Sequence, residues 1–418
     1  MNDQIAMNSL YDELAGFLNG SNGGGSGGGS GTKPEKVAVG NKASKNSTIN
    51  GEEASATNPI IPEGYIPINT STSWGYGSSA PTADNVNKGL VITDSIDASG
   101  NSNGNEWVWV PVPDASVMYE TAEAPITLTG GTKDGAGILD LKINNNPVTV
   151  SKYSKSITIT NNDNSTTTKT RVLPNVTSSY REPDVVAGSS GTSYDTNDTY
   201  RKTAGFTKTV DGTTTTMTLA EMADTMRSEY ETMIASIEKY HGFYIGRYEL
   251  NVKGEEKTGA TLTNKTWYEL YAQCKAEKLA ASNKVMSRMI WGCQWDVTCN
   301  WIANYGDKKN ISDSSTWGNY KTTSVKASDG TTEIKASGTP QILDTGITTF
   351  TRANNVYDIA GNAYEWSQEA GTNSYRASRG GNYNLSGSGN PASFRNFDFI
   401  PGNRYSTVGS RPTLIVQP

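Results

Sequence analysis

The sequence predicts an α+β fold, in which a few amphipathic helices pack on short strands. Leu219–Tyr240 repeats apolar side chains every three or four residues, which is typical of a helix with one buried face. Glu106–Val112 alternates tryptophan with valine, as a β-strand with two distinct faces does. Gly361 and the pair Gly380-Gly381 indicate tight turns, because glycine adopts positive φ without steric cost.

The composition restricts the class of protein. The chain has 418 residues, enough for two or three average domains or for one elaborated β-rich domain. It is 34% hydrophobic and 19% charged and contains 43 glycines, which is typical of extracellular or virion β-structure with long loops. The net charge of −6 argues against nucleic acid as a partner.

Neither a membrane span nor a signal peptide is recognisable. No apolar run approaches the roughly 20 residues that a membrane span needs. The first residues also lack the charged and apolar regions of a secretory signal. We therefore expect an extracellular, cell-surface or virion protein whose native targeting segment is not in this chain.

Few residues are available for catalysis or for a zinc site. The three cysteines are Cys274, Cys293 and Cys299, and an odd number leaves at least one thiol free or paired with another chain. Cys293 and Cys299 should share a helix and lie about 9 Å apart, too far for a disulfide, whereas a Cys274–Cys293 bridge stays open. The single histidine, His241, directly precedes an apolar strand, and we expect a structural role for it.

The N-terminal region differs in composition from the rest. Residues 1–19 have the spacing of an amphipathic helix, which we expect to bind a partner helix. Residues 20–59 read as a flexible linker and tether, because they begin with a regular Gly/Ser repeat. That regularity suggests a fusion tag at residues 1–32, and we expect the ordered domain to span residues 60–418.

The first half of this domain is expected to be rich in strands. Short strands are predicted in Gly64–Ile68, in Gly89–Thr93 and in Glu106–Val112, with a hairpin loop at Asp97–Asn105. An insertion at about 117–216 alternates strand-like pieces with Gly- and Asn-rich turns.

The second half holds the predicted helices. Thr218 should cap the helix Leu219–Tyr240, with Glu221 completing a capping box. Asn264 should cap a helix over Trp267–Lys278. A third helix is expected within Ile290–Ile302, and a strand in Gly242–Glu249.

Residues Asn382–Val408 have the composition of a binding surface. These 27 residues contain no Lys and no Glu, but five Asn, four Ser and five aromatic residues. Stiff aromatics combined with small polar residues are typical of antibody paratopes. The alternative is an irregular, Gly-rich surface loop. The candidate ligand-binding residues are Asn382, Tyr383, Asn384, Asn390, Asn396, Phe397, Asp398, Phe399, Ile400, Asn403, Tyr405 and Ser406.

Several short sequence motifs, in this order along the chain, resemble those of a known family. They are WVWVPV, GFYIGRYE, WYELYAQC, QWDVTCNWI, NNVYDIAGNAYEWSQE, RASRGG and GSRPTL. The series resembles the formylglycine-generating-enzyme-like (sulfatase-modifying-factor-like) branch of the C-type-lectin fold, over about residues 89–416. The resemblance implies an α+β, C-type-lectin-like domain, with the insertion at about 117–216.

The enzymes of this family are not a good match for the chemistry of the chain. They use a cysteine pair near the C-terminus, with copper, to oxidise a substrate cysteine. No cysteine follows Cys299 here, so we expect no enzyme activity. An oxidoreductase of the formylglycine-generating type remains the disfavoured alternative.

A second branch of the same fold resembles the chain more closely. In the variable proteins of diversity-generating retroelements, the segment between RGG and the last GxRP strand is diversified, and here it is Asn382–Val408. The chain also resembles pilin-linked surface proteins of gut Firmicutes. The implied function is a ligand-binding adhesin with a hypervariable face, and its partner would be a protein or glycan on another cell or virus. A structural subunit of a pilus or fibre is the other alternative.

The resemblance also implies a weak candidate for structural calcium. Family enzymes hold calcium on a loop that matches Asp358, Gly361, Ala363 and Glu365 here, partly through backbone carbonyls. The alternative is that Asp358 caps the turn and Glu365 pairs with an arginine. No other cofactor is expected.

Overall fold

A computed structural model gives the fold of the chain. It describes residues 33–68, 86–118, 127–129, 132–134, 137–139, 142–143, 156–160, 166–170, 185–186, 188, 193–277, 279–281, 283–370 and 374–418. The predicted helix at residues 1–19, the Gly/Ser repeat and much of the insertion lie outside these residues.

The chain divides into two compact units, and each is described by itself. One unit includes Ala122–Leu173, and the other consists of Lys33–Thr121 and Pro174–Pro418. The first unit contains a four-stranded sheet of order β10-β7-β11-β12 and the separate pair β8-β9. Its strands are β7 (Thr127–Thr129), β8 (Thr132–Asp134), β9 (Gly137–Leu139), β10 (Lys142–Ile143), β11 (Ser156–Thr160) and β12 (Thr166–Thr170).

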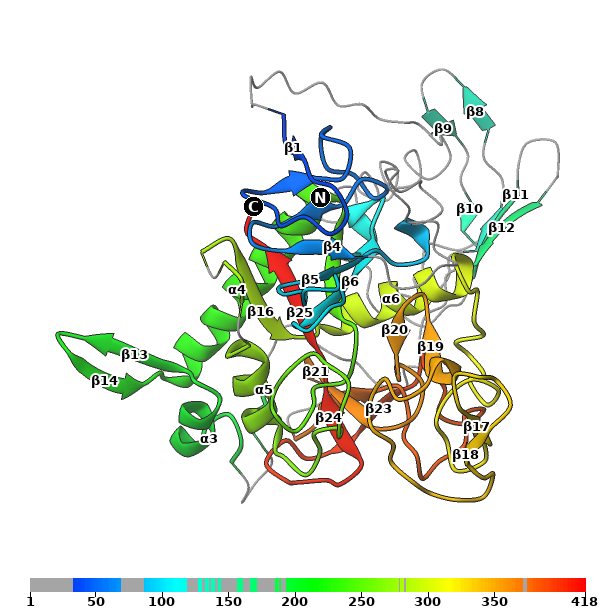
Figure 1. Cartoon of the computed structure of the whole chain (residues 1–418). Coiled ribbons are helices and arrows are strands. Elements are labelled where there is room, and N and C mark those ends of the chain that lie inside the picture. The colour runs from blue at the N-terminus through cyan, green and yellow to red at the C-terminus, as the bar shows by residue number, and fades with distance from the viewer. Residues whose placement is uncertain are drawn as a thin grey trace. The chain divides into compact units, whose positions relative to one another are not determined.

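The larger unit is built around a six-stranded antiparallel sheet of order β16-β25-β15-β6-β5-β4 (Figure 1). In its centre, Tyr244 lies opposite Trp109 on one side and opposite Leu414 on the other. All three side chains are buried, so this sheet forms part of the core. The strands are β4 (Ile66–Ile68), β5 (Val91–Thr93), β6 (Glu106–Pro111), β15 (Gly242–Gly246), β16 (Val285–Met289) and β25 (Pro412–Val416).

Three of the helices that the structure describes in this unit are longer than two turns, and the longest confirms the sequence prediction in detail. Helix α4 spans Leu219–Tyr240, and Thr218 caps it in a complete capping box with Glu221. It ends at His241, which adopts a left-handed conformation (φ 59°). The other two helices are α5 (Trp267–Lys275) and α6 (Gly292–Asn304).

The prediction for the start of α5 was wrong. The N-cap is Thr266, whose hydroxyl accepts a hydrogen bond from the backbone N–H of Glu269, while Glu269 completes the capping box. Asn264 instead occupies the left-handed region with a φ of 59°. An N-cap requires extended backbone, so Asn264 shapes the preceding turn and does not cap the helix.

A second sheet carries the candidate binding segment. Its order is β23-β22-β21-β24, and its strands are β21 (Tyr364–Ala370), β22 (Arg376–Arg379), β23 (Arg395–Phe399) and β24 (Val408–Ser410). Strand β24 runs parallel to β21, and the other two pairings are antiparallel. Residues Asn382–Val408 therefore leave the sheet at β22, return through β23 and re-enter at β24.

Smaller elements complete the larger unit. A helix α3 (Asp198–Thr203) and an exposed hairpin lie in the C-terminal part of the insertion. The remaining elements are β1 (Glu35–Lys36), β2 (Ser47–Thr48), β3 (Ile60–Ile61), η2 (Ala115–Met118), β13 (Thr207–Val210), β14 (Thr213–Thr216), β17 (Val325–Lys326), β18 (Glu333–Lys335), η3 (Thr349–Thr351), β19 (Arg352–Ala353) and β20 (Val356–Tyr357).

Residues 33–59 are not the flexible tether that the polar composition predicted. They form a three-stranded sheet with β3, and Val37, Ala43 and Ile49 are buried. The indole N–H of Trp109 also donates to the carbonyl of Ala56 (3.0 Å). A few apolar residues spaced along a polar segment were enough to attach it to the core.

No helix among the described residues is both long enough and apolar enough to cross a bilayer. All three cysteines are free and buried, so the open possibility of a Cys274–Cys293 bridge is not realised.

Candidate functional site

The candidate binding segment is held at strand β23 by a buried ionic cluster. The guanidinium of Arg395 lies 2.6 Å from a carboxylate oxygen of Asp296 and 2.7 Å from one of Glu369. Arg379, on the neighbouring strand, also pairs with Asp296 and lies 3.7 Å from Glu369. Two arginines thus balance two carboxylates in the interior, and the cluster joins α6, β21, β22 and β23. Arg395 therefore anchors the segment and is not available to a ligand.

The twelve predicted ligand-binding residues differ in exposure. Asn384, Asp398, Asn403 and Ser406 are exposed. Half-buried are Tyr383, Asn390, Phe397, Phe399, Ile400 and Tyr405.

The prediction that Asn382 and Asn396 face a ligand is not supported by their burial. Asn382 is 4% exposed and Asn396 is 8% exposed. Their side-chain oxygens accept from the backbone two residues on, at Asn384 (2.8 Å) and Asp398 (3.1 Å). Asparagine favours such local turns. Both residues shape the segment, and their exposed neighbours Asn384 and Asp398 reach solvent.

The aromatic residues of the segment pack on the core with part of each ring. Phe399 and Tyr405 have ring centroids 4.5 Å apart. Phe399 also makes edge contacts with Trp366 (5.9 Å) and Tyr364 (5.5 Å). The hydroxyl of Tyr405 accepts from the backbone N–H of Ile400 (3.1 Å). These rings have one packed side and one solvent-facing part, which fixes their orientation at the surface.

The C-terminal part of the insertion lies beside this segment. The Tyr200 ring of α3 stacks on Tyr268 with a centroid distance of 4.6 Å. Gly402 approaches the Tyr200 hydroxyl so closely that a Cβ atom there would lie 2.6 Å from it. A side chain at position 402 would therefore require the Tyr200 ring to shift, and Tyr200 forms a wall next to this loop.

A buried aspartate connects this wall to the second sheet. Asp195 is fully buried and accepts from the Tyr268 hydroxyl (2.6 Å), from Arg376 (2.6 Å) and from the backbone N–H of Val186 (2.5 Å). Sequence analysis missed this residue, because it lies 181 positions from Arg376. A buried aspartate in a stretch with the composition of a loop gives no periodic signal.

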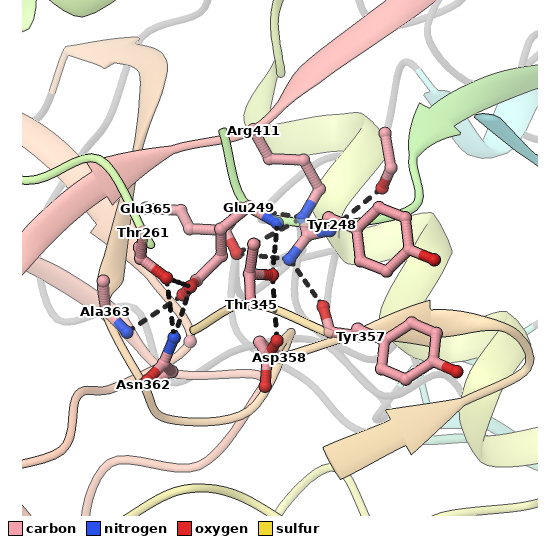
Figure 2. A network of polar contacts seen from close by, with 12 residues as sticks. Tyr248, Glu249, Thr261, Thr345, Tyr357, Asp358, Asn362, Ala363, Glu365 and Arg411 are labelled. Carbon is pink, nitrogen blue, oxygen red and sulfur yellow. Dashed lines mark hydrogen bonds and ion pairs between the residues drawn. The ribbon is translucent and has the colours of Figure 1, made fainter. Parts of the chain in front are cut away.

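The loop proposed for calcium contains a dense network of polar contacts (Figure 2). Two nitrogens of Arg411 bind the Glu365 carboxylate, at 2.7 and 2.9 Å. Asp358 accepts from the Thr345 hydroxyl (2.9 Å) and from the Gly346 N–H (2.8 Å). These contacts agree with the alternative to calcium binding, in which Asp358 caps the turn and Glu365 pairs with an arginine.

The other two residues of that loop are also engaged by protein groups. The N–H of Ala363 donates to Glu249 (2.9 Å), and the N–H of Gly361 donates to the Gly380 carbonyl (2.8 Å). Among the residues that the structure describes, no group of three or more His, Cys, Asp or Glu side chains could hold a metal ion. The contacts at Gly361 and Ala363 involve their N–H groups, so calcium binding through their carbonyl oxygens stays a prediction.

Burial dominates the electrostatics of this network. It raises the pKa of Glu249 well above the ordinary value, and the neighbouring Asp358 and Glu365 raise it further. Burial also raises the pKa of Glu365 to about 7, although the Arg411 charge opposes this. The same effect raises the pKa of Asp358. Several carboxyl groups thus surround one arginine, and they favour the protonated state more than they would in water.

The thiols offer no reactive nucleophile in the described part of the chain. Cys274, Cys293 and Cys299 are each fully buried. Burial raises the pKa of Cys299 to about 12 and also raises that of Cys274. A thiol with a raised pKa is a poor nucleophile, because the thiolate is the reactive form.

Three solved structures resemble this chain distantly. No family model matches the sequence, and no curated protein matches it. Variable protein 1 of Treponema denticola is 15% identical, with a TM-score of 0.26, over 42% of this chain and 85% of the other. The M1 and U1 variants of the Major Tropism Determinant are 11% and 13% identical, with TM-scores of 0.27 and 0.25. Each match covers 42% of this chain, which spans about half the length of those two variants. Similarity at these TM-scores carries no argument about function.

Proposed function

We propose that this protein is a ligand-binding adhesin or receptor-binding protein of a cell surface or virion, with a C-type-lectin-like scaffold. Its binding face would be the solvent-exposed part of Asn382–Val408, which we call the variable face. The observation that carries the proposal is the contrast within this segment. Arg395 is fixed among buried charges, whereas Asn384, Asp398, Asn403 and Ser406 are exposed.

A binding surface that can be diversified needs a fixed backbone together with exposed side chains. Binding residues often lie on irregular segments that a rigid framework positions. Here β21, β22 and β24 hold both ends of the segment, and Arg395 holds its middle. Substitution of an exposed residue can then change the surface chemistry without changing the backbone.

Half-buried aromatic residues would supply much of the contact energy. Phe399 and Tyr405 already have one packed side, so binding would cost them little rotamer entropy. Asn384, Asn403 and Ser406 would adapt their hydrogen bonds to the partner. The partner class would be a protein or glycan on another cell or virus.

The partner is unidentified, so the test uses diversification of the face itself. Asn384, Asp398, Asn403 and Ser406 are randomised together in a display library of the full chain. The library is selected against one unrelated protein, such as lysozyme. A matched control library randomises four exposed positions outside the variable face and its neighbouring loops, Lys36, Ala38, Asn41 and Lys42.

We expect most members of both libraries to fold, and specific binders to emerge mainly from the first. Folding is followed by protease resistance on display. Two outcomes would contradict the proposal. The first is that most variants of the face unfold, which would make the segment part of the core. The second is that both libraries yield binders equally often, which would remove any special role of the variable face.

A further inference from the structure

A concave site lies outside the variable face. It is a cleft of about 430 Å³, within the range of roughly 300–1,000 Å³ that is typical of small-molecule sites. Its walls are residues 102–104 with Glu106 on one side and residues between Tyr248 and Ala260 on the other, and we call it the loop cleft. None of its lining residues belongs to Asn382–Val408, so it is independent of the proposed binding face.

The walls of the loop cleft are fixed by local hydrogen bonds. The Asn251 side-chain oxygen accepts from the backbone N–H groups of Lys253 (2.9 Å) and Glu255 (3.1 Å). The Val252 N–H donates to the carbonyl of Ala260 (2.8 Å), which closes the loop at its base. The site is therefore preformed, and a ligand would not have to order it.

One carboxylate in the cleft has an oxygen left for a ligand. Oε2 of Glu106 accepts from Arg247 and from the Tyr248 hydroxyl (3.1 Å), and Oε1 takes part in neither contact. Because Arg247 balances the charge of Glu106, Oε1 can accept hydrogen bonds from hydroxyl groups without leaving a net negative charge in the site.

The remaining charges leave one cation unbalanced. Glu255 and Lys257 lie 3.8 Å apart and balance each other. Lys253 is exposed, lines the cleft and makes no ion pair with a residue that the structure describes. One positive charge thus remains, together with the Glu106 oxygen and the polar groups of Ser102 and Asn103.

We propose that the loop cleft binds an acidic sugar unit, a ring that carries several hydroxyls and one carboxylate. The sugar hydroxyls donate to Oε1 of Glu106, and the carboxylate faces Lys253. The exposed side chains of Val252, which is 59% exposed, and Ala260 offer an apolar surface to the C–H face of the ring. A simple inorganic anion would leave the Glu106 oxygen without a donor, and a neutral sugar would leave Lys253 without a partner.

The test compares four probes on the full chain by ligand-observed NMR titration: glucuronate, galacturonate, glucose and acetate. We expect a uronate to bind with a Kd of the order of 1 mM, and glucose to bind about two- to fivefold more weakly, as an exposed ion pair predicts. Acetate should not bind measurably. Failure of both uronates to bind, or equal binding of glucose and glucuronate, would overturn the assignment.

Variants locate the site. Lys253→Gln should remove the preference for uronate over glucose and leave the binding of glucose unchanged, whereas Lys321→Gln, at an exposed lysine elsewhere, should change neither. Ala260→Trp should block the cleft and abolish binding of all sugars. Val210→Trp, at a residue 59% exposed on hairpin β13–β14, is its matched control. Uronate binding that survives Ala260→Trp undiminished would place the site elsewhere and overturn the proposal.

Discussion

The guanidinium of Arg395 lies 2.7 Å from the carboxylate of Glu369, and both side chains are fully buried. This pair joins the segment with the composition of a paratope to the strand that supports it. A buried ion pair adds little net stability relative to apolar residues, but removal of one partner leaves a buried charge uncompensated. The pair therefore holds β23 in position, because moving the strand away would leave a buried charge without its partner.

Replacement of Arg395 tests this directly. Arg395→Met should lower the free energy of unfolding by about 3–5 kcal/mol, because Asp296 and Glu369 would share Arg379 alone. The matched control is Arg404→Met in the same segment. Arg404 pairs with Glu269 at 2.7 Å, but its side chain is 54% exposed, so the loss should stay below about 1 kcal/mol. Urea unfolding measures both, and similar losses in the two variants would contradict the assigned role.

Two glycines with the same backbone conformation should respond differently to alanine. Gly361 has a φ of +76° and Gly330 a φ of +74°. A Cβ atom at Gly361 would lie 2.4 Å from the carbonyl oxygen of Asn319, whereas one at Gly330 would meet nothing within 4 Å. Gly330→Ala should cost about 1–2 kcal/mol from the left-handed conformation alone. Gly361→Ala should cost about 1–3 kcal/mol more, from overpacking. Equal losses in urea unfolding would show that the Asn319 contact relaxes without cost.

The corrected N-cap of α5 gives a third prediction. Thr266→Ala should lower the free energy of unfolding by about 1 kcal/mol, because the N–H of Glu269 loses its acceptor. Asn264→Gly should be close to neutral, since glycine adopts the left-handed conformation of Asn264 easily. The reverse order of the two losses in thermal unfolding would restore Asn264 as the cap.

Buried carboxyl groups should make the fold less stable as pH rises. Burial raises the pKa of Glu277 to about 8 and that of Glu365 to about 7, from an ordinary value of 4.5. The folded chain thus keeps protons that the unfolded chain releases. The stability that these groups contribute is complete below about pH 4.5 and is lost as pH rises through 7 and 8.

The measurement is the free energy of unfolding between pH 5 and pH 8. It should fall by a few kcal/mol across this range. Glu277→Gln should make the slope shallower, because the amide cannot ionise. Glu229 acts in the opposite sense: burial favours a raised pKa, but the charges of Arg288 and Lys275 outweigh it and lower the pKa below the ordinary value. A flat or rising profile for the native chain would contradict the prediction.

The sequence predicted those elements whose determinants are local. Helix α4 matched at both ends, because Thr218, Glu221 and the apolar stripe lie within one stretch of chain. Strand β6 was predicted from its alternating pattern for the same reason. At α5, two residues with good capping side chains stood close together. The sequence itself distinguished them, because Thr266 has Glu269 three residues on, as a capping box requires, whereas Asn264 has Trp267 there. The prediction overlooked this local signal.

The composition of Asn382–Val408 indicated an unusual surface but not which residues are exposed. Asn382 and Asn396 were expected to face a ligand, and their local backbone hydrogen bonds hold them inside. Arg395 was overlooked because an arginine is normally exposed, and its burial depends on Asp296 and Glu369 from distant parts of the chain. Asp195 was missed for the same physical reason.

The position of β25 has a consequence for how the protein is made. This strand lies between β15 and β16, in the interior of the six-stranded sheet, although it comes after all the other strands in the chain. Until Pro412–Val416 has left the ribosome, β15 and β16 present unpaired edges to other chains. Such edges promote aggregation, so the nascent protein depends on protection until synthesis has passed these residues. Ribosome stalling shortly before Pro412 should therefore yield chains that bind chaperones and resist refolding.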